Sequence, residues 1–170
     1  MARPLDTDYP AYPKRYVDLV HESDIILALE NQERDLPAFL DGIHSSKAHY
    51  AYAPGKWTVV QALQHIIDSE RIFVYRALCM ARGEQQPLPG FEQDDYAGQA
   101  PATHRNLVEL TQELMTLRRS TIHLFKSFTP DVYQRRGIAN GNNSYTVLSI
   151  GYIIVGHVQH HLNILTEQYL

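Results

Sequence analysis

The sequence predicts an all-α protein, a four-helix bundle whose helices are joined by long loops. Two observations support this prediction. In four segments apolar residues return at steps of three and four, which is the period of an amphipathic helix. No segment shows the convincing apolar–polar alternation that a half-buried strand would need. With 170 residues, the chain is long enough to bury a core as a single domain, residues 1–170.

The first two helices are expected at residues 24–43 and 58–82. In the first, Pro37 should kink or split the helix, because proline lacks a backbone donor and crowds the preceding turn. The second begins with Thr-Val-Val-Gln from Thr58, a capping box in which two side chains satisfy free amides at a helix start. Gly83 is a suitable residue for its end.

The third and fourth helices are expected at residues 103–127 and 146–170. The Asn-Gly-Asn-Asn segment at 140–143 predicts a turn before the fourth helix. The N-terminal arm, residues 1–15, is rich in proline and tyrosine and is expected to be extended. The third helix has the most regular pattern, typical of a bundle seam, with Leu107, Leu110, Leu114, Leu117, Thr121, Leu124 and Phe128 on one line.

Composition and charge limit the cellular compartment and the classes of partner expected for this protein. The net charge of −4 provides no basic surface for nucleic acid. There is no apolar N-terminal leader, and no apolar run is long enough to span a bilayer. Cys79 is the only cysteine, which excludes an internal disulfide and suits a reducing compartment. We therefore expect a cytoplasmic protein whose partner is a small-molecule substrate, with neither nucleic acid nor membrane involved.

Three histidines lie on helix stripes that are otherwise apolar: His65, His157 and His161. Residues four apart on a helix are displaced by about 40° and rise by roughly 6 Å, so His157 and His161 point the same way. Buried polar groups need partners, and a divalent metal is one that several imidazoles can share. His65, on another helix, is the candidate third ligand. His160 is offset by about 60–100° from its two neighbours and is assigned to the helix flank.

Spacing alone leaves a simpler interpretation open. The chain has nine histidines, so a His-x-x-x-His pair arises easily by chance, and a core histidine usually only hydrogen-bonds a neighbour. The remaining histidines have no partner at a matching position. We interpret them as surface residues: His21, His44, His49, His104 and His123.

Four motifs carry a resemblance to a known family. They are Gly-Lys-Trp-Thr at 55–58, His65 with Asp-Ser-Glu-Arg-Ile-Phe at 68–73, Pro-Leu-Pro-Gly-Phe-Glu at 87–92, and the Gly-His and His-His pairs within 156–161. In this order they resemble the DinB-like superfamily, in its DinB_2 branch, over nearly the whole chain from about Tyr16. That superfamily also contains bacillithiol transferases and mycothiol-dependent isomerases.

The resemblance implies an up-down-down-up bundle of the DinB-like type, in which His65, His157 and His161 bind nickel or zinc. It also implies a homodimer and, as a second cofactor, a low-molecular-weight thiol. Three functions follow as hypotheses. The first is a metal-dependent S-transferase that uses a small thiol, and the second is a metal-dependent hydrolase. The third is a non-catalytic metal- or ligand-binding module related to stress. Fold alone does not choose among them.

Further side chains are candidates for the chemistry. Asp68 lies about 60° from His65 on the helix and is a candidate general base, whereas Glu70, at about 140°, should bind a neighbouring helix or face solvent. Trp57 is expected to pack over the start of its helix. Cys79 is expected to be a small core residue. Four arginines could recognise an anionic group or form surface ion pairs: Arg71, Arg76, Arg118 and Arg119.

Overall fold

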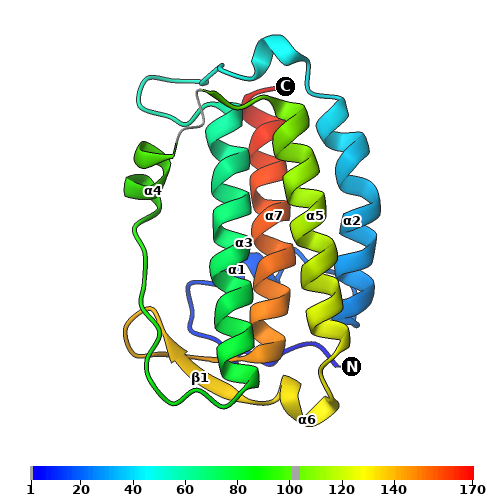
Figure 1. Cartoon of the computed structure of the whole chain (residues 1–170), viewed down its shortest axis with the longest axis vertical. Helices are drawn as coiled ribbons and strands as arrows, with labels where there is room; N and C mark the ends of the chain where they lie inside the picture. The colour runs from blue at the N-terminus through cyan, green and yellow to red at the C-terminus, as the bar shows by residue number, and fades with distance from the viewer. Residues whose placement is uncertain (1, 101–103) are drawn as a thin grey trace.

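The computed structural model describes residues 2–100 and 104–170. Four long helices stand side by side in a bundle, which confirms the predicted fold class (Figure 1). Their bounds fall within a few residues of the expected ranges, and residue 103, the expected start of the third, lies outside the described residues. The helices are α2 (Ile25–Asp41), α3 (Val59–Ala81), α5 (Leu107–Lys126) and α7 (Val147–Gln168).

The helices run up, down, down and up in chain order, as the family resemblance implies (Figure 1). The bundle is closed by contacts of α3 with α7, α2 with α5, α3 with α5, and α2 with α7. Because α3 and α5 are parallel neighbours, the chain between them must return along the whole bundle. This return carries the short helix α4 (Gln93–Gln99), which lies beside α3.

Side-chain caps set several helix starts. The capping box expected at Thr58 is present, and Asn106 and Thr146 form equivalent boxes at α5 and α7. Gly83 follows α3 with φ of 82°, as its expected role at the helix end requires. Of the two outcomes expected at Pro37, a split does not occur, because α2 continues through it. Leu36 and Leu40 are buried on either side, and their packing outweighs one missing hydrogen bond.

Two short strands also form, although no segment of the sequence shows the alternation expected of a strand. β1 (Arg136–Ala139) and β2 (Asn143–Thr146) form an antiparallel hairpin at the lower end of the bundle. Strands of four residues are too short for alternation to be recognised in the sequence. The expected turn joins them: Ala139 pairs with Asn143, and the three residues between them include Asn140 and Gly141, both with positive φ.

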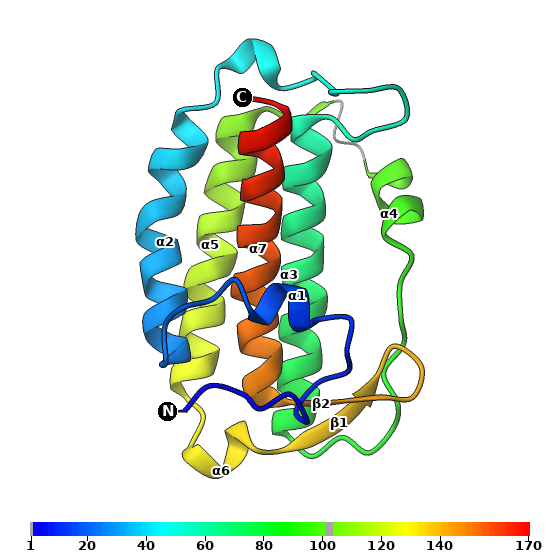
Figure 2. The same ribbon diagram turned by 180° about the vertical axis from the view of Figure 1, so that it is seen from behind.

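The N-terminal arm is folded rather than extended. It contains turns and the short helix α1 (Lys14–Val17), and it crosses the face of α7 (Figure 2). Tyr9 and Tyr16 are buried, and Arg136 of β1 donates to the carboxylate of Asp8. The other short elements are η1 (Ser45–Lys47) and α6 (Pro130–Tyr133). In the described part of the chain, none of the helices has the length and apolar character that a membrane crossing requires.

A polar layer divides the core into two apolar clusters. The lower cluster contains Ile25, Phe125 and Ile150, and the upper contains Leu36, Leu63 and Leu162. Between them, Arg118 of α5 donates from Nε and Nη2 to the two carboxylate oxygens of Glu70 in α3, at 3.0 and 2.8 Å. Both residues are fully buried.

The same layer connects all four long helices. Thr121 donates to Glu70 at 2.8 Å, and Arg118 donates to Gln32 of α2 at 2.7 Å. The amide of Gln32 in turn donates to the backbone carbonyl of Val155 in α7 at 3.0 Å. Each polar group in this layer has a partner, which is the condition for burying charge inside a bundle.

Replacing Arg118 should destabilise the fold strongly. Arg118→Met leaves the Glu70 carboxylate buried without a counter-charge, so we expect the free energy of unfolding to fall by about 3–5 kcal/mol in urea titrations. Arg119→Met is the matched control, because the adjacent Arg119 pairs with Glu33 at an exposed position; its loss should be below about 1 kcal/mol. Equal, small losses in both variants would contradict the role of the buried pair.

Candidate metal centre

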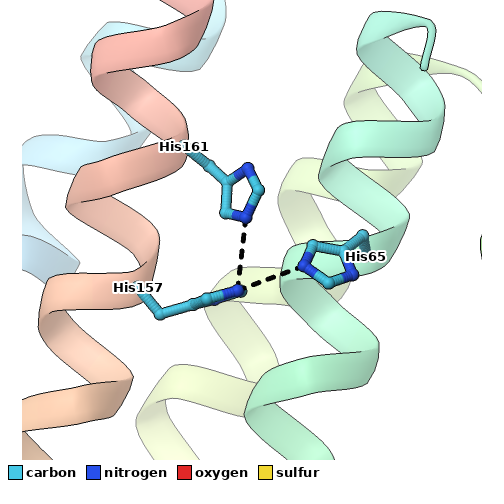
Figure 3. A group of neighbouring side chains, drawn as sticks. All are labelled: His65, His157 and His161. Atoms are coloured by element: carbon cyan, nitrogen blue, oxygen red, sulfur yellow. Dashed lines mark hydrogen bonds between the residues drawn. The ribbon is translucent and has the colours of Figure 1, made fainter. Parts of the chain in front are cut away.

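Three histidine side chains meet at the level of the polar layer, on the side of α3 that is turned away from Glu70. His157 and His161 project from successive turns of α7, and His65 reaches them from α3 (Figure 3). The Nε2 atom of His157 lies 3.1 Å from that of His65 and 3.2 Å from that of His161. All three residues offer a ring nitrogen within 4.8 Å of the others. The structure therefore brings together the three residues that the sequence singled out.

The spacing of these nitrogens fits one divalent ion. In zinc sites the metal lies about 2.0–2.1 Å from each imidazole nitrogen, which at bond angles of about 90–109° separates two ligand nitrogens by about 2.9–3.4 Å. The two measured separations, 3.1 and 3.2 Å, fall in this range. Three imidazoles also leave coordination positions for a further ligand, as catalytic sites do.

Burial keeps the three rings neutral. Desolvation lowers the pKa of His65 to about 4 and that of His161 to about 3. It holds the pKa of His157 well below its usual range, and the neighbouring imidazoles act in the same direction there. At pH 7 all three rings are therefore unprotonated, which is the form that binds a metal through a nitrogen lone pair.

Aromatic side chains surround the cluster. The ring of Trp57 lies 4.6 Å from that of His65 and stacks at 6.4 Å on that of His161, centre to centre. The sequence predicts only that Trp57 packs over the start of its helix, so its contact with the histidines is an addition from the structure. Tyr16 packs edge-on against His157 at 5.4 Å, and Phe73 does so at 5.6 Å.

Gly156 makes the approach of Tyr16 possible. A Cβ atom at position 156 would lie 2.0 Å from the backbone oxygen of Tyr16, so only glycine lets α1 pack this closely on α7. Gly156, which precedes His157 in the sequence, therefore allows the N-terminal arm to pack over the histidines.

Two clefts adjoin the cluster. The upper cleft, of about 710 Å³, is lined by Trp57 and His161, whereas the lower cleft, of about 380 Å³, is lined by His65 and His157. Both share Tyr16 and a carboxylate, Asp94. Together they give access to all three histidines.

Asp68, the expected base, has other partners. Its carboxylate accepts from Gln64 at 3.0 Å and pairs with Arg71 at 3.4 Å, and it lines neither cleft. Asp94 of α4 lines both clefts, and Glu92 lines the lower one. The charge of Asp94 raises the pKa of His65, although burial has the larger and opposite effect. Only the return of the chain along α3 brings Asp94 here, so helix periodicity could not have found it.

The other residues singled out in the sequence either pack inside the bundle or lie on its surface. Glu70 binds a neighbouring helix, one of the two roles expected for it, and Arg118 is its buried partner. Cys79 is partly buried against the lower cluster. His160 lies beside the cluster but outside it, with its ring 5.2 Å from that of His161. The histidines assigned to the surface are exposed: His21, His44, His49, His104 and His123. Arg71 and Arg119 form the exposed ion pairs expected of them.

The family model described as the DinB superfamily matches residues 28–165, which include α3, α7 and all three histidines. The chain belongs to the DinB superfamily. Among curated proteins, none matches the chain. A solved structure with the same fold is that of YfiT from Bacillus subtilis, described as a probable metal-dependent hydrolase with an unusual four-helix bundle topology. The two chains are 17% identical, the alignment covers 96% of each, and the TM-score is 0.74. At that identity the likeness of this DinB-superfamily protein to YfiT concerns the fold.

The arrangement of the three histidines predicts that the purified protein contains a metal ion. Protein purified without an affinity tag should contain about one divalent ion per chain by elemental analysis, and His157→Ala should lose it because two ligands remain. His160→Ala is the local control and should keep the metal, since its ring is outside the cluster. Metal retained by His157→Ala, or lost equally in both variants, would contradict the three-histidine site.

Proposed function

We propose that this protein is a metal-dependent enzyme for small molecules, most specifically an S-transferase that uses a low-molecular-weight thiol. The observation that supports this proposal is the pair of clefts on either side of the histidines. A transfer reaction needs room for two organic molecules, a thiol and an electrophile, at one reacting centre. Hydrolysis needs room for one molecule and water.

The three histidines would hold nickel or zinc, and a bound divalent ion would supply a lowered pKa for a thiol or a water molecule. The family resemblance is the support for these two metals and for a homodimer, and the single cysteine is the support for a cytoplasmic location. We propose all of these on those grounds.

The chain itself would provide the proton acceptor. In the proposed reaction the thiol loses its proton, its sulfur forms a bond to an electrophilic carbon, and the leaving group departs with the bonding electrons. Asp94 lines both clefts and is therefore the side chain we propose to take the proton and return it to the leaving group. Ser69, whose hydroxyl lies 3.4 Å from Nε2 of His65, can donate a hydrogen bond in the lower cleft.

A hydrolase is the second candidate. It is supported by the description of YfiT and by the same carboxylate, which could equally take a proton from water. A non-catalytic metal-binding module, the third hypothesis, would show neither activity.

Thiol-dependent conjugation is the test of the first proposal. With bacillithiol, mycothiol and glutathione as thiols and monochlorobimane as electrophile, we expect a rate above the uncatalysed background with at least one thiol. Chelation or His157→Ala should abolish this rate, and His123→Ala, at an exposed position of α5, should not change it. Chelator-sensitive cleavage of esters, amides or lactones without any thiol would favour the hydrolase and contradict S-transfer. No activity in either assay would favour the binding module.

The two carboxylates can be distinguished in whichever assay shows activity. Asp94→Asn should lower kcat by about 10²–10⁴, the usual contribution of a general base, without loss of metal. Asp68→Asn is the isosteric control on α3 and should stay within about threefold of the original kcat, because its partners are Gln64 and Arg71. The reverse pattern would restore Asp68 as the base and remove Asp94.

A further inference from the structure

Arg76 is a buried cation for which the described residues provide no carboxylate partner. Its side chain is 5% exposed, and it forms no ion pair in the described part of the chain. Its one hydrogen bond within those residues runs from Nη2 to the backbone carbonyl of Pro89, at 2.7 Å. The other deeply buried arginine, Arg118, has Glu70 bound to two of its nitrogens. Burying an unpaired charge is costly, so the difference between the two arginines requires an explanation.

The position of Arg76 explains why it has no partner of this kind. It lies eleven residues after His65 on α3, and at about 100° per residue the two share a helix face, with Ser69 and Phe73 between them. All four line the lower cleft. Arg76 is therefore at the far end of the cleft that opens on the proposed metal centre.

Contacts with aromatic rings show how far Arg76 lies from the histidines. The Arg76 guanidinium carbon lies 6.0 Å from the ring centre of Phe73, and that centre lies 5.6 Å from the His157 ring. A second aromatic ring, Phe91, is also 6.0 Å from the guanidinium. A small molecule that touches the histidines at one end can thus reach Arg76 at the other, along an aromatic wall.

We propose that Arg76 binds a carboxylate group of the molecule that occupies the lower cleft. A guanidinium presents paired N–H donors that match the two oxygens of a carboxylate. Glu92 and Asp94 also line this cleft, and their negative charges favour a singly charged carboxylate over a doubly charged phosphate. Desolvation lowers the pKa of Arg76, as burial does for any cation. This inference rests on the proposal that the lower cleft holds a substrate.

Binding of simple probes tests the inference without turnover. Phenylacetate, its neutral analogue phenylacetamide, and phenyl phosphate are titrated calorimetrically into the 170-residue protein, as purified and in the His157→Ala background. The second background removes binding of the carboxylate to a metal as an explanation. We expect phenylacetate to bind at least tenfold more tightly than phenylacetamide in both, and phenyl phosphate to bind more weakly than phenylacetate.

Variants of Arg76 separate recognition of charge from support of the Pro89 loop. Arg76→Met should reduce the preference for phenylacetate over phenylacetamide at least tenfold, whereas Arg76→Lys, which keeps the charge, should retain part of it. Arg71→Met, on the exposed side of α3, should behave like the original protein. A purely structural role would weaken both probes equally and leave their ratio unchanged, and Arg76→Lys gives this ratio even if Arg76→Met does not fold.

Any of four results would overturn the inference. The first two are no preference for phenylacetate over phenylacetamide in the original protein, and a preference that is unchanged in Arg76→Met. The other two are a preference that is fully lost in a folded Arg76→Lys, and Arg76-dependent binding of phenyl phosphate that is tighter than that of phenylacetate. Because none of these measurements uses a reaction, failure of the S-transfer assay leaves the inference standing. Its own failure likewise leaves the proposed reaction open.

Discussion

The buried pair of Glu70 and Arg118 is the constraint on which the rest of the structure depends. Because both charges are inaccessible to water, α3 has to present Glu70 towards α5. His65 lies five residues earlier, about 140° around the same helix, so this orientation turns it towards α7. The polar layer therefore fixes the rotation of α3 and, with it, the meeting of the three histidines. Gln32 extends the constraint to α7 through its bond to Val155.

The up-down-down-up order of the helices then completes the site. Parallel α3 and α5 require a long return segment, and this segment places α4 with Asp94 beside the histidines and Pro89 beside Arg76 (Figure 1). On the adjoining face, Gly156 lets the N-terminal arm pack on α7, so that Tyr16 becomes a wall common to both clefts. The bundle supplies the histidines, and its irregular connections supply the surroundings in which a substrate would bind.

Features that depend on one helix could be predicted from the sequence, and features that depend on distant contacts could not. The shared direction of His157 and His161 follows from their spacing of four, and the cap at Thr58 from its motif. Pro37 does not split α2, because buried residues on both sides of it keep the helix continuous, and this packing is not visible in the local sequence. Asp94 and Trp57 reach the site through loops, and Arg118 differs from Arg119 only in the face it occupies. Even where periodicity is clear, it does not reveal which helix lies opposite.

The central claim is that His65, His157 and His161 bind one divalent ion through their Nε2 atoms. Anomalous diffraction from crystals of the metal-loaded protein, collected on either side of the absorption edge of the metal, tests it most directly. The account predicts one anomalous peak per chain at about 2.0–2.2 Å from all three Nε2 atoms, with the remaining coordination positions facing the clefts. A peak bound instead by His160, by the Nδ1 atoms or by a surface histidine, or no peak between α3 and α7, would contradict it.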